Sequence, residues 1–284
     1  MSSVEAPVYQ PVHPWMRRFL WLAAGLVTVV GVQLFVLSEH TERFFAWTIQ
    51  NPLTAAFLGA AYWSSAVLEA IAARQTAWSR ARPAVPAVLL FTLLTLITTL
   101  VHLDQFHLGA DQALETRLLT TVWLGVYLLV PPALLVMLII QMRVPGAEPP
   151  LVRQLPFWLR AVVSVQSAVL VALGAVLFVT PDAATHIWPW PLTILAARAV
   201  GAWLLGLGVA AAQVMLEADW SRVRPVSAAC AVFALLQGLA LARYPERFSW
   251  ETSLGWMYLA FLAGLLALGV YGLHAGRAVE PAQR

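Results

Sequence analysis

The sequence predicts an all-α integral membrane protein with eight transmembrane helices, arranged as two parallel four-helix repeats. Of the 284 residues, 61% are hydrophobic and only 11% are charged, and the mean hydropathy is +0.76. A soluble domain of this length carries far more charge on its surface. The number and arrangement of the helices follow from two further observations: eight apolar stretches, and a segment that occurs once in each half of the chain.

The eight apolar stretches have the length of membrane spans. A hydrocarbon core of about 30 Å needs roughly 20 residues of helix. Stretches of this kind lie at 19–38, 53–74, 84–103, 118–142, 157–179, 192–216, 226–243 and 252–275. Seven spans are the alternative, because 226–243 is short and contains Gln237. Seven spans would place the two termini on opposite sides of the membrane.

The distribution of arginine predicts the orientation of the spans. The chain has 17 basic residues, all of them arginine. With eight spans, the terminal side carries twelve of them, at positions 17, 18, 74, 80, 82, 143, 153, 160, 222, 224, 277 and 284. The opposite side carries four, at positions 43, 117, 243 and 247. Because basic residues accumulate on the cytoplasmic side, both termini are expected to be cytoplasmic.

Two similar segments predict an internal repeat. Pro52-Leu53-Thr54 is followed by WSRARP at 78–83, and Pro191-Leu192-Thr193 by WSRVRP at 220–225, so each proline is expected to open a span. Each copy holds an even number of spans, which implies a pseudo-two-fold axis along the membrane normal. The expected organisation is a cytoplasmic tail (1–18), a first repeat (19–142), a cytoplasmic linker (143–156), a second repeat (157–275) and a cytoplasmic tail (276–284).

The second and sixth spans are rich in alanine and glycine. Small residues let helices approach closely in lipid. These two spans are therefore expected at the centre, with a binding site between the repeats.

The segment FFAWTIQNPLTAAFLGAAYW at 44–63 resembles a family of uncharacterised bacterial multi-pass membrane proteins, in which an aromatic stretch precedes a PLT-type helix start. Asn51 departs from that pattern, which has a proline before Pro52. The resemblance implies a bacterial origin and a multi-pass architecture, and hence a location in the bacterial cytoplasmic (inner) membrane. It implies no activity.

Glu69 lies inside the second predicted span, about one turn from its inner end. An ionisable side chain at the centre of a membrane helix costs about 2.5 to 3.5 kcal/mol, so it indicates a functional site. One hypothesis is a proton-coupling or substrate-binding carboxylate. The alternative is a side chain that reaches the interface and pairs with Arg74, Arg80 or Arg82.

Arg198 lies about two turns inside the outer end of the sixth predicted span. Its neighbours are small, which predicts a face packed by protein, where the charge needs a partner. That partner is expected to be a backbone carbonyl, a loop carboxylate, an anionic small ligand or a lipid headgroup. The alternative is a guanidinium that extends to the outer headgroups. The PLT alignment matches Arg198 with Gly59.

The third span carries Thr92, Thr95, Thr99 and His102 on one helical face. This stripe predicts a polar path that opens outward. The alternative is that the threonine hydroxyls donate to carbonyls of their own helix.

A metal site is a further hypothesis at the outer end of this span, formed by His102, Asp104 and His107. The alternative is a group of ordinary interfacial histidines. Cys230 is the only cysteine, which excludes an internal disulfide, and no histidine pair lies at mid-depth to hold a haem. The sequence does not identify a cofactor. Pro131-Pro132 is expected to break or kink the fourth span.

The leading functional hypothesis is small-solute or lipid binding or transport between the repeats. Its candidate ligand residues are Arg198, Glu69, Thr95, Thr99 and His102. The alternative is a non-catalytic structural or accessory subunit of a membrane complex, with another membrane protein as partner. An enzyme is least favoured, because no nucleophile, paired carboxylates or complete metal set lies at membrane depth. The lipid bilayer is an expected partner and nucleic acid is not.

Overall fold

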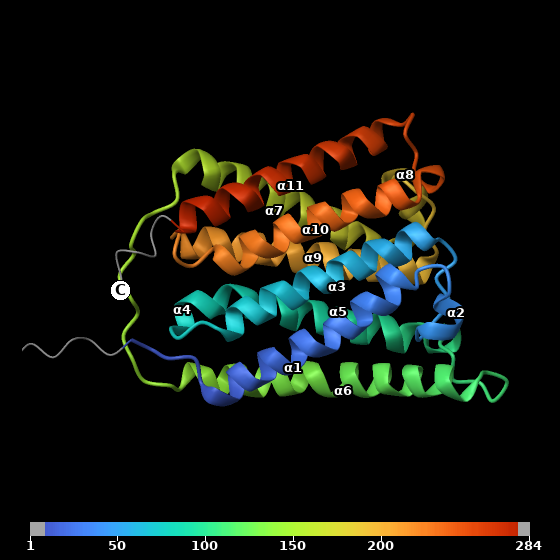
Figure 1. Cartoon of the computed structure of the whole chain (residues 1–284), viewed down its shortest axis with the longest axis horizontal. Helices are drawn as coiled ribbons and strands as arrows, with labels where there is room; N and C mark the ends of the chain where they lie inside the picture. Colours follow the sequence, from blue (N-terminus) through green and yellow to red (C-terminus); the bar gives the residue numbers. More distant parts are fainter. Residues whose placement is uncertain (1–8, 278–284) are drawn as a thin grey trace, which may run out of the picture.

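Eight long helices make up most of residues 9–277, the part of the chain that the computed structural model describes (Figure 1). They are α1 (Pro14–Gly31, prolonged by a π-helical turn at Val32–Val36), α3 (Pro52–Ala73), α5 (Val85–Val101), α6 (Leu114–Met142), α7 (Phe157–Val179), α9 (Ile194–Glu217), α10 (Arg224–Arg243) and α11 (Ser253–Arg277). All eight are long and apolar enough to cross a membrane. The prediction of an all-helical chain with eight such helices is confirmed, and the stretch 226–243, on which the seven-span alternative rested, lies in one of them, α10.

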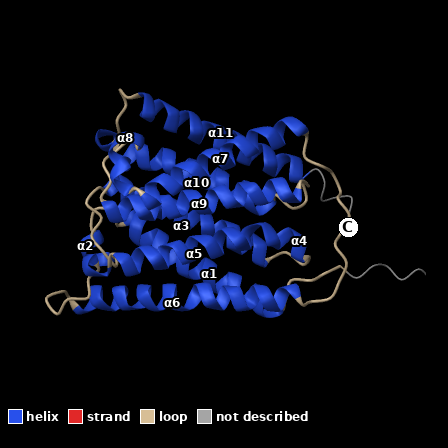
Figure 2. Ribbon diagram, turned by 180° about the vertical axis from the view of Figure 1, so that it is seen from behind, coloured by secondary structure: helices blue, strands red, loops and turns tan. Residues whose placement is uncertain are grey.

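Three short helices mark the two ends of the bundle (Figure 2). They are α2 (Thr41–Phe44), α4 (Trp78–Ala81) and α8 (Ala184–Ile187). α2 and α8 lie at one end, called here the α8 end, and α4 lies at the other, the α4 end. α1 begins and α11 ends at the α4 end, so the helix ends that adjoin the two predicted tails lie on the same side of the bundle. Residues 1–8 and 278–284 of those tails lie outside the described part.

The bundle has four inner and four outer long helices. In the most apolar stretch of α3, α5, α9 and α10, between 50% and 72% of the residues are buried, against 22% to 33% in α1, α6, α7 and α11. α3 packs against α1 and α10, and α9 packs against α7 and α5. The expected central position of α3 and α9 is therefore shared with α5 and α10. α3 contacts α10, the third long helix of the second half, and α9 contacts α5, the third long helix of the first half.

Two glycines explain how α3 and α9 pack so closely against the helices that precede them. A Cβ atom on Gly59 would lie 2.4 Å from the backbone nitrogen of Phe35, and one on Gly201 would lie 2.9 Å from that of Phe178. No larger residue fits such distances without moving the backbone. The same small-residue contact thus occurs once in each half of the chain.

The two halves also share their backbone hydrogen bonds. At the α4 end, the segment before the first long helix of each half pairs with the segment before the third. These bonds run from Val12 N–H to Thr76 O, from Trp78 N–H to Gln10 O, from Leu155 N–H to Ala218 O and from Trp220 N–H to Arg153 O. At the α8 end, His107 N–H donates to Ala46 O, and Ser249 N–H donates to Pro189 O. Leu155 follows Val12 by 143 positions, and Trp220 follows Trp78 by 142.

The start of α9 corrects one expectation. α3 begins at Pro52, with Asn51 as its N-cap, but α9 begins at Ile194, with Thr193 as its N-cap. Pro191 therefore lies before the helix, because the cap is provided by the hydroxyl of Thr193, two residues later. When the two helices are aligned at their N-cap residues, Asn51 and Thr193, Gly201 stands opposite Gly59. In this alignment of the caps, Arg198 stands opposite Ala56, three positions from its place in the PLT alignment.

The fourth long helix does not break at its proline pair, and the kink that was the other expectation stays a prediction. α6 runs from Leu114 to Met142 with Pro131 and Pro132 inside it (Figure 1). Each proline removes one backbone hydrogen bond, but its fixed φ angle is compatible with a helix. The chain therefore continues through both residues as helix.

Candidate functional site

A cavity of about 520 Å³ lies at the α8 end, between segments of both halves. The first turns of α3 and α9 line two of its sides, and the segment around a short 3₁₀ helix (Pro245–Arg247) lines another. Its polar lining consists of Gln50, Asn51, Thr54, Thr193, Glu246, Arg247 and Ser249. None of these was selected as a site residue from the sequence, because the cavity forms only when segments far apart in the chain meet.

The first turns of α3 and α9 present few free backbone donors to this cavity. Asn51 Oδ1 accepts from Leu53 N–H at 3.0 Å, and Thr193 Oγ1 accepts from Ala196 N–H at 3.2 Å. Pro52 has no N–H to offer. Since a helix N-terminus attracts anions through unpaired N–H groups, this pair is only a weak anion site. The side-chain amides and hydroxyls of the lining suit a small polar solute.

The cavity is closed toward the middle of the bundle. Trp190 Nε1–H donates to Thr54 Oγ1 at 2.9 Å beneath it. Deeper, Gln237 donates to the Phe57 carbonyl at 3.1 Å and accepts from the Tyr258 hydroxyl at 3.0 Å. The glutamine that favoured the seven-span alternative is therefore a satisfied, fully buried residue of α10.

Arg198 and His102 lie together where α9 packs against α5. The Arg198 guanidinium donates to His102 Nε2 and, through Nε, to the Phe178 carbonyl at 3.3 Å. Among the described residues, no carboxylate pairs with it. Burial, and then the Arg198 charge, lower the pKa of His102, which lies just outside the membrane span of α5. His102 is therefore a neutral imidazole that accepts from Arg198.

Glu69 does not reach the interface. Its side chain is buried, with 1% of the residue exposed, and Oε1 accepts a hydrogen bond from Ser65 Oγ at 3.0 Å. Arg82, an expected partner, binds Glu217 and Glu148 instead. The alternative in which Glu69 pairs with an interfacial arginine is therefore wrong.

The threonine stripe of α5 mostly bonds to its own helix. Thr92 Oγ1 donates to the Val88 carbonyl at 2.9 Å, and Thr99 Oγ1 donates to the Thr95 carbonyl at 2.8 Å. Thr99 also accepts from Trp123 Nε1–H at 3.2 Å. The Thr95 hydroxyl is buried without a partner among the described residues. The stripe faces other helices, and Thr95 is the member of it whose hydroxyl has no hydrogen-bond partner among the described residues.

The three candidate metal ligands do not converge. His107 is engaged at both ring nitrogens, with Phe45 O at 3.1 Å and Thr48 Oγ1 at 3.0 Å, while His102 contacts Arg198. Asp104 is exposed. Within residues 9–277, no group of three His, Cys, Asp or Glu side chains is placed to hold a metal ion.

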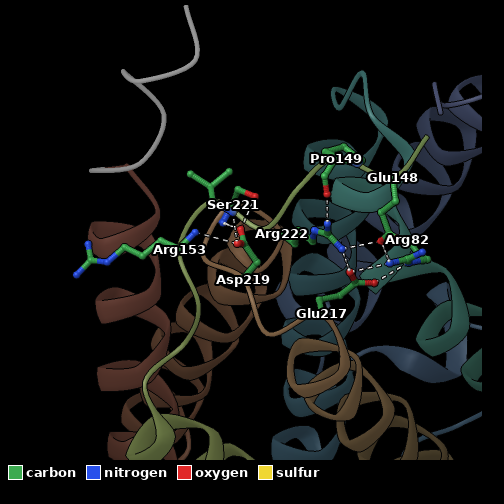
Figure 3. A network of polar contacts seen from close by, with 9 residues as sticks. Arg82, Glu148, Pro149, Arg153, Glu217, Asp219, Ser221 and Arg222 are labelled. Carbon is green, nitrogen blue, oxygen red and sulfur yellow. Dashed lines mark hydrogen bonds and ion pairs between the residues drawn. The ribbon is translucent and has the colours of Figure 1, made fainter. Parts of the chain in front are cut away.

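A ring of four charged residues at the α4 end was not predicted (Figure 3). Glu217, at the end of α9, accepts from Arg82 Nε at 2.6 Å and from Arg222 at 2.8 Å. Glu148, in the linker, accepts from the same two arginines at 2.7 Å each. The ring is electrically neutral and joins the first half, the second half and the linker. Both arginines of the ring lie in the WSRxRP motifs, one in each. These motifs were the feature of the sequence that could have indicated the ring.

Asp219 fixes the linker beside this ring (Figure 3). Its buried carboxylate accepts from the backbone N–H groups of Val152, Arg153 and Ser221, at 2.6, 2.9 and 2.8 Å. The preceding residue, Ala218, turns the chain with a left-handed φ of 49°. The α4 end is thus held by charged and backbone contacts, whereas the α8 end contains the polar cavity.

Comparison with known proteins adds no family: no protein-family description, curated protein or solved structure matches this chain. The geometry of the two ends is therefore the basis for a function.

Proposed function

We propose that this protein binds a small polar solute in the cavity at the α8 end, as a solute-binding or transport protein of the membrane. The observation that carries the proposal is the cavity of about 520 Å³, lined from both halves of the chain. Small-molecule sites usually measure about 300 to 1,000 Å³. The lining residues Asn51 and Thr193 belong to the ends of long helices, which hold a site more precisely than loops do.

We infer further that the two halves are parallel four-helix repeats. Paired backbone contacts in the two halves support this arrangement, as do the matching glycines Gly59 and Gly201. The elements correspond as well: residues 14–36 and 157–179 form the first span of each half, and residues 41–44 and 184–187 form the short helix that follows. The cavity would then lie near the pseudo-two-fold axis, where a site can draw on both units.

The proposed orientation places the α4 end in the cytoplasm of a bacterial cell and the cavity on the outer side of the inner membrane. The arginine excess on the terminal side supports it. The test replaces Cys230 by alanine and introduces one cysteine at Ala110 or at Ala147. A membrane-impermeant maleimide should label position 110 in intact cells, and position 147 only after permeabilisation. The opposite pattern would reverse the orientation.

Binding is tested by thermal unfolding of the purified protein with zwitterionic amino acids, sugars, inorganic phosphate and glycerol phosphate as probes. A ligand at about 100 times its Kd stabilises the folded state by about 2.7 kcal/mol, so one class should give a saturable rise in Tm. Ser249→Trp, which fills the cavity, should abolish that rise, while Ala110→Trp in an exposed loop should leave it intact. A response to diacyl lipid but not to glycerol phosphate would identify a lipid headgroup as the ligand.

The accessory-subunit function is the other outcome of the same experiment. It would replace solute binding if no probe shifts the Tm and a second membrane protein co-purifies in fixed proportion.

A further inference from the structure

We propose that Glu69 is a proton-binding site inside the helix bundle: the carboxyl carries a proton on Oε2 in the resting protein and can give it up. This site is independent of the cavity at the α8 end. It rests on the position of the side chain, its single hydrogen bond, and the absence of an arginine at either carboxyl oxygen.

The position of Glu69 keeps its carboxyl away from water. α3 ends at Ala73, so a rise of about 1.5 Å per residue places Glu69 roughly 6 Å inside that end. The residue is buried, and Ser65, one turn earlier on the same helix, donates to Oε1 at 3.0 Å. Oε2 is buried without a hydrogen-bond partner among the described residues.

The charged groups on the helices around α3 are engaged elsewhere. Arg17 of α1 donates to the Gln75 carbonyl, Arg82 binds Glu217 and Glu148, Arg198 of α9 contacts His102, Arg222 binds Glu217, and Arg243 of α10 donates to the Phe35 carbonyl. Arg80 and Arg224 also have interactions of their own. α6 presents Tyr127, whose hydroxyl is bonded to that of Tyr62 at 2.6 Å. No cation is thus bonded to the Glu69 carboxyl in the described part of the chain.

These surroundings favour the neutral acid. An ionised carboxylate would have one hydrogen bond and no counter-charge in an apolar interior, which is costly. In the protonated form, Oε1 still accepts from Ser65, and the hydrogen on Oε2 has no acceptor that would hold it. That hydrogen is therefore the one available for exchange when an acceptor, such as a water molecule, reaches the site.

Packing alone does not require an acid here. The residue 142 positions further on, at the corresponding place on α9, is Ala211. An alanine thus occupies the equivalent place in a helix with the same glycine contact. The carboxyl of Glu69 is a feature of one half only.

The test is infrared spectroscopy of the protein reconstituted in lipid, which separates the carbonyl stretch of a protonated acid from the bands of a carboxylate. The wild type should show a protonated-acid band at pH 7, and Glu69→Gln, of nearly identical shape, should lack it. Ser65→Ala should shift the frequency of the band without removing it, because the carbonyl loses its donor. Glu115→Gln, at an exposed acid of α6, is the matched control and should leave the band unchanged.

Two results would overturn the proposal: no protonated-acid band in the wild type at pH 7, or a band that persists undiminished in Glu69→Gln. If Glu69→Gln does not fold, the Ser65→Ala spectrum decides, since an unshifted band there assigns the proton to another acid.

Discussion

The two halves of the chain make similar backbone contacts but bury different polar side chains. In the first half, Glu69 bonds to Ser65 about one turn from the end of α3, and the hydroxyls of Tyr62 and Tyr127 bond to each other. In the second half, Tyr258 bonds to Gln237. The positions 142 residues further on from Tyr62, Glu69 and Tyr127 are Leu204, Ala211 and Gly269. The backbone contacts are therefore compatible with either polar or apolar contents, and function has to be sought in the differences.

Two apolar cavities of the bundle differ in volume. A cavity of about 300 Å³ is lined by α7, α9, α10 and α11 of the second half and by Phe57 of α3, with Leu170 and Phe261 among its residues. A cavity of about 150 Å³ lies in the first half, between α1 and α6, and is lined in part by Val27 and Tyr127. The first of these two cavities thus has about twice the volume of the second.

The largest expected loss of stability comes from a substitution in the charged ring that joins the two halves. Glu217→Ala removes the buried acid of the charged ring and leaves Arg222, which is 4% exposed, with only Glu148 as its acid partner. Breaking a buried ion pair costs about 3 to 5 kcal/mol, and we expect the lower end because Glu148 remains. Thermal unfolding in detergent measures the loss.

Glu148→Ala is the matched control for this prediction. The Glu148 side chain is 54% exposed, so its removal should cost about 1 kcal/mol or less. Equal losses for the two variants would mean that the ring does not hold the halves together through Glu217.

Substitutions at Gly59 and Gly201 test whether the close helix contacts of the two halves are equivalent. Gly59→Ala and Gly201→Ala should each destabilise by about 1 to 3 kcal/mol, because the new methyl group meets backbone atoms of the preceding helix. Gly238→Ala, where nothing lies within 4 Å of the added methyl, should be neutral or slightly stabilising. A large loss at Gly59 alone would show that the frame differs between the halves.

Substitutions of Tyr62 and Tyr127 test the buried hydrogen bond between their hydroxyls in the first half. Tyr62→Phe and Tyr127→Phe should each cost about 0.5 to 1.5 kcal/mol, because each leaves one buried hydroxyl without its partner. The double variant should cost less than the sum of the two, since no unpaired hydroxyl remains. Denaturant unfolding of the three variants measures the coupling, and strict additivity would contradict a direct bond.

The sequence predicts the helices better than their pairing. Eight helices and the interior position of α3 and α9 follow from local features, namely apolar length and small residues. Arg198 and His102 were both selected, yet their contact joins residues 96 positions apart and depends on the packing of α5 against α9. The bond of Arg82 to Glu217 spans 135 positions, which no local pattern encodes. The expectation that Pro191 opens a span was wrong because α9 begins three residues later, at Ile194, where Thr193 provides the N-cap.

The smallest expected effect concerns pH and the linker. Hydrogen bonding from Arg82, assisted by Arg222, lowers the pKa of the Glu148 carboxyl below its ordinary value of 4.5. Because the folded pKa is the lower one, Glu148 stabilises the fold above about pH 4.5, and this contribution is lost as the pH falls through the folded value. Screening at this half-exposed site limits it to less than about 1 kcal/mol. The Tm difference between wild type and Glu148→Gln should therefore be positive at pH 7, should vanish once the pH falls below the folded pKa of Glu148 and should decrease in high salt. A difference that stays near zero at every pH would show that the neutral amide holds the linker as well as the carboxylate does, and that the charge of Glu148 adds nothing to the contact between the halves.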